Sequence, residues 1–232
     1  MGIFHKFHFI YNFPDGYPFY KKVIANFLFF ITGIIIHPRK NLLNHNDLIK
    51  ARFLLKKGDV ILVGNLREVS ALFIKGPVTH STLYVGNKRF IQAVGDGVEY
   101  CSLHHIFTEY DTLTILRMPK GVKKRKKIIK DTIRFAEKQI GKPYDFDFSG
   151  DSKKFFCTEL VNSAYQHAGY KTGLKTIGKF KTVIEKIERI VITAHKALHP
   201  EDFIKGNYDI IFTSHNLKLK KKLVFTMRGK EV

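Results

Sequence analysis

Residues 58–94 read GDVILVGNLREVSALFIKGPVTHSTLYVGNKRFIQAV, and three short segments within them have the composition of β-strands. The first, 60–63, is wholly apolar, which indicates a strand that is buried on both faces. The second and third, 79–85 and 89–94, are separated by the turn residues Gly86 and Asn87. Their spacing predicts an antiparallel meander.

The pattern changes toward helices in the second half of the chain. Apolar residues recur at helical spacing over 128–140. They recur again, four apart, from Phe156 to Ala168, and Gly169 stands where a left-handed C-cap is expected. Further strands are expected at Leu113–Arg117 and Phe203–Phe212. Strands followed by helices predict an α+β fold.

The composition is that of a compact and strongly basic protein. Its 232 residues are 44% hydrophobic, which suffices for one domain with an elaboration and excludes a mainly disordered chain. Two cysteines cannot build a disulfide scaffold, and this favours a reducing compartment. The formal net charge of +20 predicts an anionic partner, such as a phospholipid surface. No recognised nucleic-acid-binding module is present, so specific nucleic-acid binding is not expected.

An apolar run, Val23–Ile36, stands between basic residues near the start of the chain. It is shorter than the roughly 20 residues of a spanning helix. It also starts too late, and lacks the small residues after it, for a signal peptide. Two interpretations stay open: a helix buried against the core domain, or a segment that dips into a membrane surface. We expect a cytoplasmic or peripheral membrane protein rather than a secreted one.

Two basic runs add to this picture. Lys120–Lys130 and Lys218–Lys222 are rich in Lys and Arg. They are either solvated surface or further contacts to an anionic membrane.

Cys157 is the first candidate for a reactive residue. It lies in the first turns of the helix expected after Ser152, where backbone N–H groups and the helix dipole favour a thiolate. A thiolate there is a nucleophile, and its own N–H can stabilise a developing oxyanion. The alternative is a small, buried apolar residue.

His80 and Gln92 form a second candidate group. His80 begins a strand, and it can act as a general base if that strand packs against the start of the Cys157 helix. Gln92 lies on the next strand, where it can face the same way and fix the His80 tautomer through a hydrogen bond. Taken singly, each could be an ordinary polar strand residue.

These motifs together resemble the two halves of the NlpC-type papain-like hydrolases. The GDVILV segment, His80 with LYVG, and IQA resemble the half that carries the catalytic His. The GKPYD segment at 141–145 and the FFCTELV segment at 155–161 resemble the half that carries the catalytic Cys. Here the Cys half comes second, which is the order of the circularly permuted, YaeF/YiiX-like cysteine amidases and peptidases. His199–Phe203 resembles the Pro-Asp segment of that branch, and the match covers about residues 58–212.

The resemblance implies a permuted papain-like fold, an antiparallel sheet with the Cys at the N-terminal end of a packed helix. It implies Cys157 as nucleophile, His80 as base and Gln92 at the polar position that orients the His. Tyr144 would bind substrate or donate to the oxyanion, and its alternative is a core tyrosine. Asp145 and Glu159 also match family positions, and we expect them to be structural.

The implied reaction is the hydrolysis of an amide bond, peptide or lipid-linked, through a thioester acyl-enzyme. No metal and no cofactor are required. His104 and His105 follow Cys101 closely, but without further ligands at suitable spacing a solvated loop is expected there. The alternatives are a non-enzymatic basic adaptor on the same fold, which binds a membrane or an acidic partner, and a thiol acyltransferase that acts on lipid acyl groups.

The expected organisation has three parts. Residues 1–57 form an N-terminal extension that contains the apolar segment. Residues 58–212 form the hydrolase domain. Residues 213–232 form a basic C-terminal tail or a last strand. The oligomeric state is left open.

Overall fold

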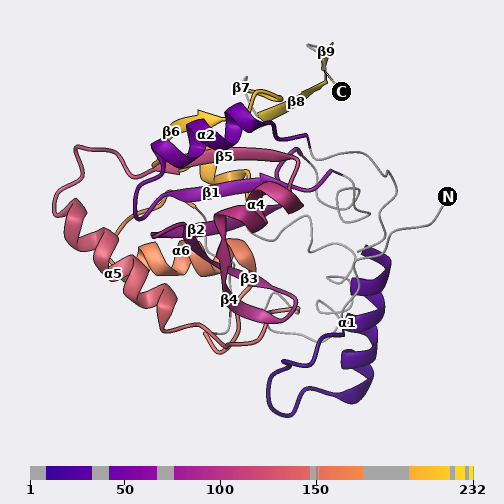
Figure 1. Cartoon of the computed structure of the whole chain (residues 1–232). Helices are drawn as coiled ribbons and strands as arrows, with labels where there is room; N and C mark the ends of the chain where they lie inside the picture. Colours follow the sequence, from indigo (N-terminus) through magenta and orange to yellow (C-terminus); the bar gives the residue numbers. More distant parts are fainter. Residues whose placement is uncertain are drawn as a thin grey trace.

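The structure is a computed structural model of the chain, shown in Figure 1. It describes residues 9–32, 42–66, 76–146, 150, 152–174, 199–219, 223–227 and 230–231. The helices are α1 (Phe19–Thr32), α2 (His45–Leu54), α4 (Leu103–Glu109), α5 (Arg125–Glu137), α6 (Cys157–His167) and α8 (Asp202–Lys205). The strands are β1 (Val60–Gly64), β2 (His80–Gly86), β3 (Arg89–Val94), β4 (Gly97–Ser102), β5 (Thr112–Arg117), β6 (Asp209–Thr213), β7 (Leu217–Leu219), β8 (Leu223–Met227) and β9 (Lys230–Glu231).

The centre of the molecule is a six-stranded sheet in the order β4-β3-β2-β1-β5-β6. All its strand pairs are antiparallel. β1, β2 and β3 follow one another as the expected meander, and β4 extends it by one strand. One of these strands, β4, was not expected from the sequence. Gly95, Asp96 and Gly97 look like the end of a strand, but Gly95 and Asp96 form a tight turn and Gly97 already begins β4.

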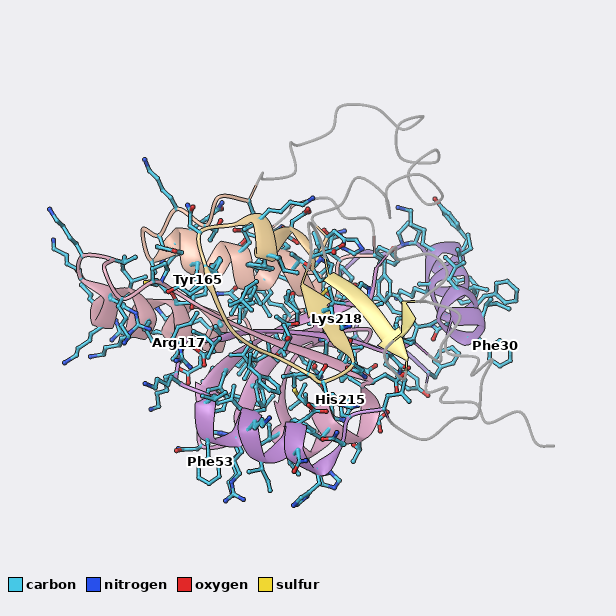
Figure 2. All side chains as sticks on the ribbon, turned by 90° about the horizontal axis from the view of Figure 1, so that it is seen from above. Phe30, Phe53, Arg117, Tyr165, His215 and Lys218 are labelled. Atoms are coloured by element: carbon cyan, nitrogen blue, oxygen red, sulfur yellow. The ribbon has the colours of Figure 1, made fainter. Side chains whose placement is uncertain are left out.

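Helices cover both faces of this sheet, which confirms the α+β class. Val60 and Leu62 of β1 belong to the core cluster that includes α6 and Ala136 of α5. Ile61 and Val63 belong to the cluster on the other face, with residues of α2 and α4. β1 is buried along its whole length, as its apolar sequence predicts. On one face, Tyr165 of α6 is fully buried and its hydroxyl donates to the carbonyl of Gly58, which ties α6 to the start of β1. Figure 2 shows Tyr165 within this layer.

Helix α6 starts later than the sequence suggested. It begins at Cys157 itself, because residues 155 and 156 are still extended. Phe155 forms a parallel bridge with Tyr144, and its N–H donates to the carbonyl of Pro143 at 3.2 Å. The end of the helix agrees with expectation, since Gly169 has a φ of +81°.

The C-terminal third also differs from expectation. Phe203–Phe212 is not one strand: the short helix α8 comes first, and β6 starts only at Asp209. Gly206 ends the helix, and the buried Phe203 points its side chain into the core. After β6, the strands β7, β8 and β9 form a separate three-stranded sheet.

Helix α1 lies at one side of the molecule, beyond the end of the β3–β4 hairpin (Figure 1). The interpretation of the apolar segment as a buried helix is wrong for the part that the structure describes, because most of its large side chains are exposed. Residues 33–36 of that segment lie outside the described residues. Among the described residues, no helix is both long and apolar enough to cross a membrane.

Candidate active site

Cys157 occupies the first position of α6. The first N–H groups of a helix have no partner within it, so a thiol at this position faces a cluster of donors and the positive end of the helix dipole. Its side chain is buried, with 8% of the residue exposed. The later start of α6 thus places the thiol closer to the helix terminus than the sequence alone suggested.

His80 lies at the start of β2, next to this thiol. Burial alone would raise the pKa of Cys157, but its hydrogen bond to His80 and the His80 charge lower that pKa to about 7. Thr158 and the backbone of Ser81 act in the same direction. For His80, burial lowers the pKa, but the hydrogen bond and charge of Cys157, the hydrogen bond to Gln92 and the charge of Glu99 together outweigh it, so that the pKa lies above its usual value. The two shifts are opposite in sign and favour a thiolate–imidazolium pair.

Gln92 links His80 to a carboxylate that sequence reasoning missed. The Gln92 side-chain oxygen lies 3.1 Å from His80 Nε2, and the Gln92 nitrogen donates to Glu99 Oε1 at 2.9 Å. Glu99 stands directly opposite Gln92 on β4. It escaped detection because β4 itself was not expected, and no motif marks an isolated Glu in a strand.

This chain of contacts sets the protonation of the imidazole. A carboxylate only accepts hydrogen bonds, so Glu99 must face the NH₂ group of Gln92. The Gln92 carbonyl oxygen is thereby directed to His80, and Nε2 must carry a proton in order to donate to it. Because Nε2 is engaged by Gln92, the hydrogen bond between His80 and the thiol of Cys157 is assigned to His80 Nδ1. The hydrogen bond to Gln92 and the charge of Glu99 both help to raise the pKa of His80.

Tyr144 lies beside the pair. It is bridged to Phe155, two residues before Cys157, and is partly buried. Burial raises the pKa of its phenol well above the usual value, and the nearby Cys157 charge adds to this. The hydroxyl therefore stays protonated at neutral pH and can donate a hydrogen bond.

Two further side chains surround the site. The ring of Tyr110 stacks parallel to that of His80, with centroids 5.8 Å apart. The Thr158 hydroxyl lies 3.6 Å from Cys157 Sγ and receives a hydrogen bond from Ser81 at 3.5 Å. Thr158 and Ser81 adjoin Cys157 and His80 in the sequence, but nothing in the sequence singles out Tyr110.

Cys101 provides an internal contrast. It is buried in the cluster on the opposite face of the sheet, among residues such as Phe90 and Ile106. Burial, aided by the charge of Glu99, raises its pKa to about 12. The two buried cysteines thus differ, because a hydrogen bond to an imidazole lowers the pKa of Cys157 and burial dominates that of Cys101.

Asp145 and Glu159 hold the backbone around the site, as expected. Asp145 is fully buried, pairs with Lys154 at 2.9 Å and accepts from the N–H of Gly150. Glu159 accepts from the N–H of Phe156, the N-cap of α6, at 3.4 Å. Both carboxylates are therefore committed to local structure.

Within the described ranges, no group of three or more His, Cys, Asp or Glu side chains is arranged to hold a metal ion. A groove of about 520 Å³ lies between α2 and α4, and it contains none of the candidate site residues. Its lining includes Leu43, Arg52 and His104.

Comparisons with known proteins establish the family and the fold of the chain. Residues 54–208 match the model of the permuted papain-like amidase family, YaeF/YiiX type. Among solved structures, one described as metalloprotein YiiX from Escherichia coli is 19% identical, with a TM-score of 0.52, and the match covers 69% of this chain and 98% of that one. At this identity the likeness supports the fold, and the permuted papain-like class is confirmed. No curated protein matches the chain in sequence. Because the family match spans well over half of its length, this chain belongs to the permuted papain-like amidases of the YaeF/YiiX type.

Proposed function

We propose that this protein cleaves an amide bond with Cys157 as the nucleophile, His80 as the general base and acid, and Gln92 as the group that orients His80. Family membership supports a cysteine-type amidase or peptidase. The observation that carries the residue assignment is the contrast between two buried thiols. Contact with His80 brings the pKa of Cys157 down to about 7, whereas burial drives that of Cys101 up to about 12.

The proposed reaction has two halves. In the first, the Cys157 thiolate attacks the carbonyl carbon and a tetrahedral oxyanion forms. The His80 imidazolium then gives its proton to the leaving nitrogen, the C–N bond breaks, and an amine and a thioester result. In the second, neutral His80 takes a proton from water, the oxygen attacks the thioester, and the C–S bond breaks. A carboxylic acid leaves, and the thiolate–imidazolium pair is restored.

Two donors are available for the oxyanion. The N–H of Cys157 is a first-turn amide without an intrahelical acceptor. The Tyr144 phenol, held protonated by burial, is the second. We assign Tyr144 this role, or that of a substrate contact, in preference to a purely structural one.

The test is alkylation with iodoacetamide over a range of pH, mapped separately to Cys157 and Cys101. We expect Cys157 to react with a midpoint near 7, and Cys101 to stay unlabelled in the folded protein. In His80→Ala, labelling of Cys157 should move to higher pH, because the hydrogen bond and charge that lower its pKa are lost. Equal, slow labelling of both thiols, with no effect of His80→Ala, would favour the non-enzymatic adaptor.

A second measurement separates hydrolysis from acyl transfer. The protein is mixed with candidate peptide amides or lipid amides, and the acyl-enzyme is trapped by acid and located by mass at Cys157. Added amines or alcohols then compete with water for the thioester. A free acid as the main product supports hydrolysis, and an amide or ester of the added acceptor supports the acyltransferase.

A further inference from the structure

Helix α1 presents an apolar face to solvent. Seven large side chains on it are each at least 42% exposed: Phe19, Tyr20, Val23, Ile24, Phe27, Leu28 and Phe30. At about 100° per residue they cover roughly half of the helix circumference. Contiguous exposed apolar surface of this kind marks a contact with another molecule or with a membrane.

The orientation of α1 is fixed by specific contacts on its other side. The buried Asn26 side chain accepts from the N–H of Ile10 at 2.8 Å and donates to the carbonyl of Lys22 at 3.0 Å. The ring of Phe29 packs onto Gly95, where a Cβ atom would lie 2.5 Å from it. The apolar face therefore points outward because the polar anchor and Phe29 point inward.

The charges around this face suit an anionic surface. α1 contains no acidic residue, and Lys21 falls beside one edge of the apolar arc, whereas Lys22 lies on the inner side, with its ammonium nitrogen 5.8 Å from the centroid of the Phe13 ring. A lysine at the edge of the arc can extend along the helix and place its ammonium group at the level of lipid headgroups. Residues 1–41 carry five Lys or Arg and one Asp, and the whole chain has a net charge of +20.

We propose that α1 docks in the interface of an anionic lipid membrane, with its aromatic face in the acyl region and its axis in the membrane plane. A helix of 14 residues is about 21 Å long, which suits a helix that lies in the interface. A second copy of this chain or an apolar protein would satisfy the aromatic face, but neither explains the absence of acids from α1 and the excess of basic over acidic residues in 1–41.

The docked helix would lie next to the candidate active site. The centroids of the Tyr144 and Phe146 rings are 5.0 Å apart, and those of the Phe146 and Phe29 rings are 6.2 Å apart. Phe29 belongs to α1. Three aromatic rings thus connect the site to the inner side of α1. If the proposed function holds, the favoured substrate is an amide carried on a lipid or presented at the bilayer surface.

The test uses the absence of tryptophan from the sequence. Phe30→Trp places one reporter on α1, and Phe53→Trp places one on α2, where Phe53 is 82% exposed. Figure 2 shows the two phenylalanines on different sides of the molecule. Emission is recorded without vesicles, with phosphatidylcholine vesicles, and with vesicles that contain phosphatidylserine. We expect a blue shift for Phe30→Trp with the anionic vesicles only, and none for Phe53→Trp.

Flotation of the same vesicles gives the strength of binding. Phe19→Ser/Phe27→Ser should lower the partition coefficient by about tenfold or more, because two exposed aromatic side chains no longer insert. Circular dichroism checks that the variant is folded, and Phe53→Ser is its matched control.

Each other outcome would overturn the proposal. No binding of the unmodified protein to anionic vesicles, or equal shifts at positions 30 and 53, would remove α1 as the docking surface. Blue-shifted emission of Phe30→Trp in the absence of vesicles would mean that a protein surface already covers the apolar face of α1. Size-exclusion chromatography would then show whether that protein is a second copy of this chain. None of these measurements needs catalysis, so they fail or succeed independently of the reaction at Cys157.

Discussion

At the scale of single residues, the candidate site contains a chain of hydrogen bonds from His80 through Gln92 to a carboxylate. Gln92 is neutral, and a neutral amide alone gives an imidazolium no charge support. Glu99 supplies that charge one residue farther away, through the 2.9 Å hydrogen bond to Gln92. The site therefore combines a neutral orienting group with a more distant negative charge, which raises the pKa of His80 without a direct ion pair.

Glu99→Gln tests this role at the residue scale. Removing the charge lowers the pKa of His80, since Glu99 helps to raise it. The imidazolium then loses its proton at lower pH, and the basic limb of the kcat/KM profile should shift to lower pH. We expect kcat/KM at neutral pH to fall, because a smaller fraction of the protein then holds the imidazolium that protonates the leaving nitrogen. The measurement is the pH profile of amide hydrolysis, or of Cys157 alkylation if no substrate is known.

The matched control is Glu137→Gln, which removes the same charge from an exposed position on α5. It should leave the profile unchanged. If Glu99→Gln lowered the stability of the protein but left the pH dependence of kcat/KM unchanged, the role of Glu99 would be structural only.

At the scale of elements, the start of β4 fixes the loop that carries Tyr144. The N–H of Val98 donates to the carbonyl of Lys142 at 2.8 Å, and the N–H of Gly141 donates to the carbonyl of Val98 at 2.9 Å. Gly97 makes this approach possible. Its φ is +109°, and a Cβ atom there would lie 2.3 Å from the Lys142 carbonyl oxygen.

Gly97→Ala should therefore destabilise the protein and disturb the site together. A left-handed backbone at a non-glycine residue and the clash with Lys142 should lower the free energy of unfolding by about 1–3 kcal/mol or more. Urea denaturation measures this loss. Cys157 alkylation should still occur, whereas turnover should fall, because Tyr144 is displaced and the Cys157–His80 contact is not.

Gly121→Ala serves as the comparison. Nothing lies within 4 Å of a Cβ atom at Gly121, so this change should be close to neutral. A Gly97→Ala protein as stable as Gly121→Ala would show that β4 and the Tyr144 loop are not held together in this way.

At the scale of the whole molecule, the basic run Lys120–Lys130 and the apolar helix α1 lie on different sides of the protein. Both views show α5, whose start carries the basic run Lys120–Lys130, at the side opposite α1 (Figures 1 and 2). The expectation that this run and the apolar segment contact one membrane together therefore does not fit the arrangement. The lysine that matters for docking is Lys21, at the edge of the apolar arc of α1.

Two charge variants test this orientation. Lys21→Gln should weaken partition onto anionic vesicles about fivefold, at about 1 kcal/mol for a basic residue near the surface. Lys123→Gln/Lys126→Gln/Lys127→Gln removes more charge but should change partition by about twofold at most. At physiological salt the Debye length is about 8 Å, so charges on the opposite side are screened. Flotation at 0.15 M salt measures both, and the reverse order of effects would place α5 on the membrane.

The parts of this protein that depend on local pattern could be predicted from its amino-acid sequence. The apolar run of β1, the turn at Gly86 and the helical periodicity through α6 predict the strands and the Cys helix because side chains on one face of an element must share its polarity. The permuted order of the His80 and Cys157 motifs identified the family, since both halves had to occur in one chain. Neither inference requires knowledge of distant contacts.

The contacts around the candidate site and the exposed surfaces depend on distant parts of the chain and could not be predicted from local pattern. Glu99 becomes relevant because antiparallel pairing puts it opposite Gln92, and a cross-strand partner leaves no trace in the sequence around it. α6 starts at Cys157 because Phe155 pairs with Tyr144, a contact made by a separate segment. The apolar pattern of α1 is the same whether a core or a membrane covers it. Its outward orientation follows from Asn26 and Phe29, whose partners at Ile10 and Gly95 are adjacent to them only in the folded chain.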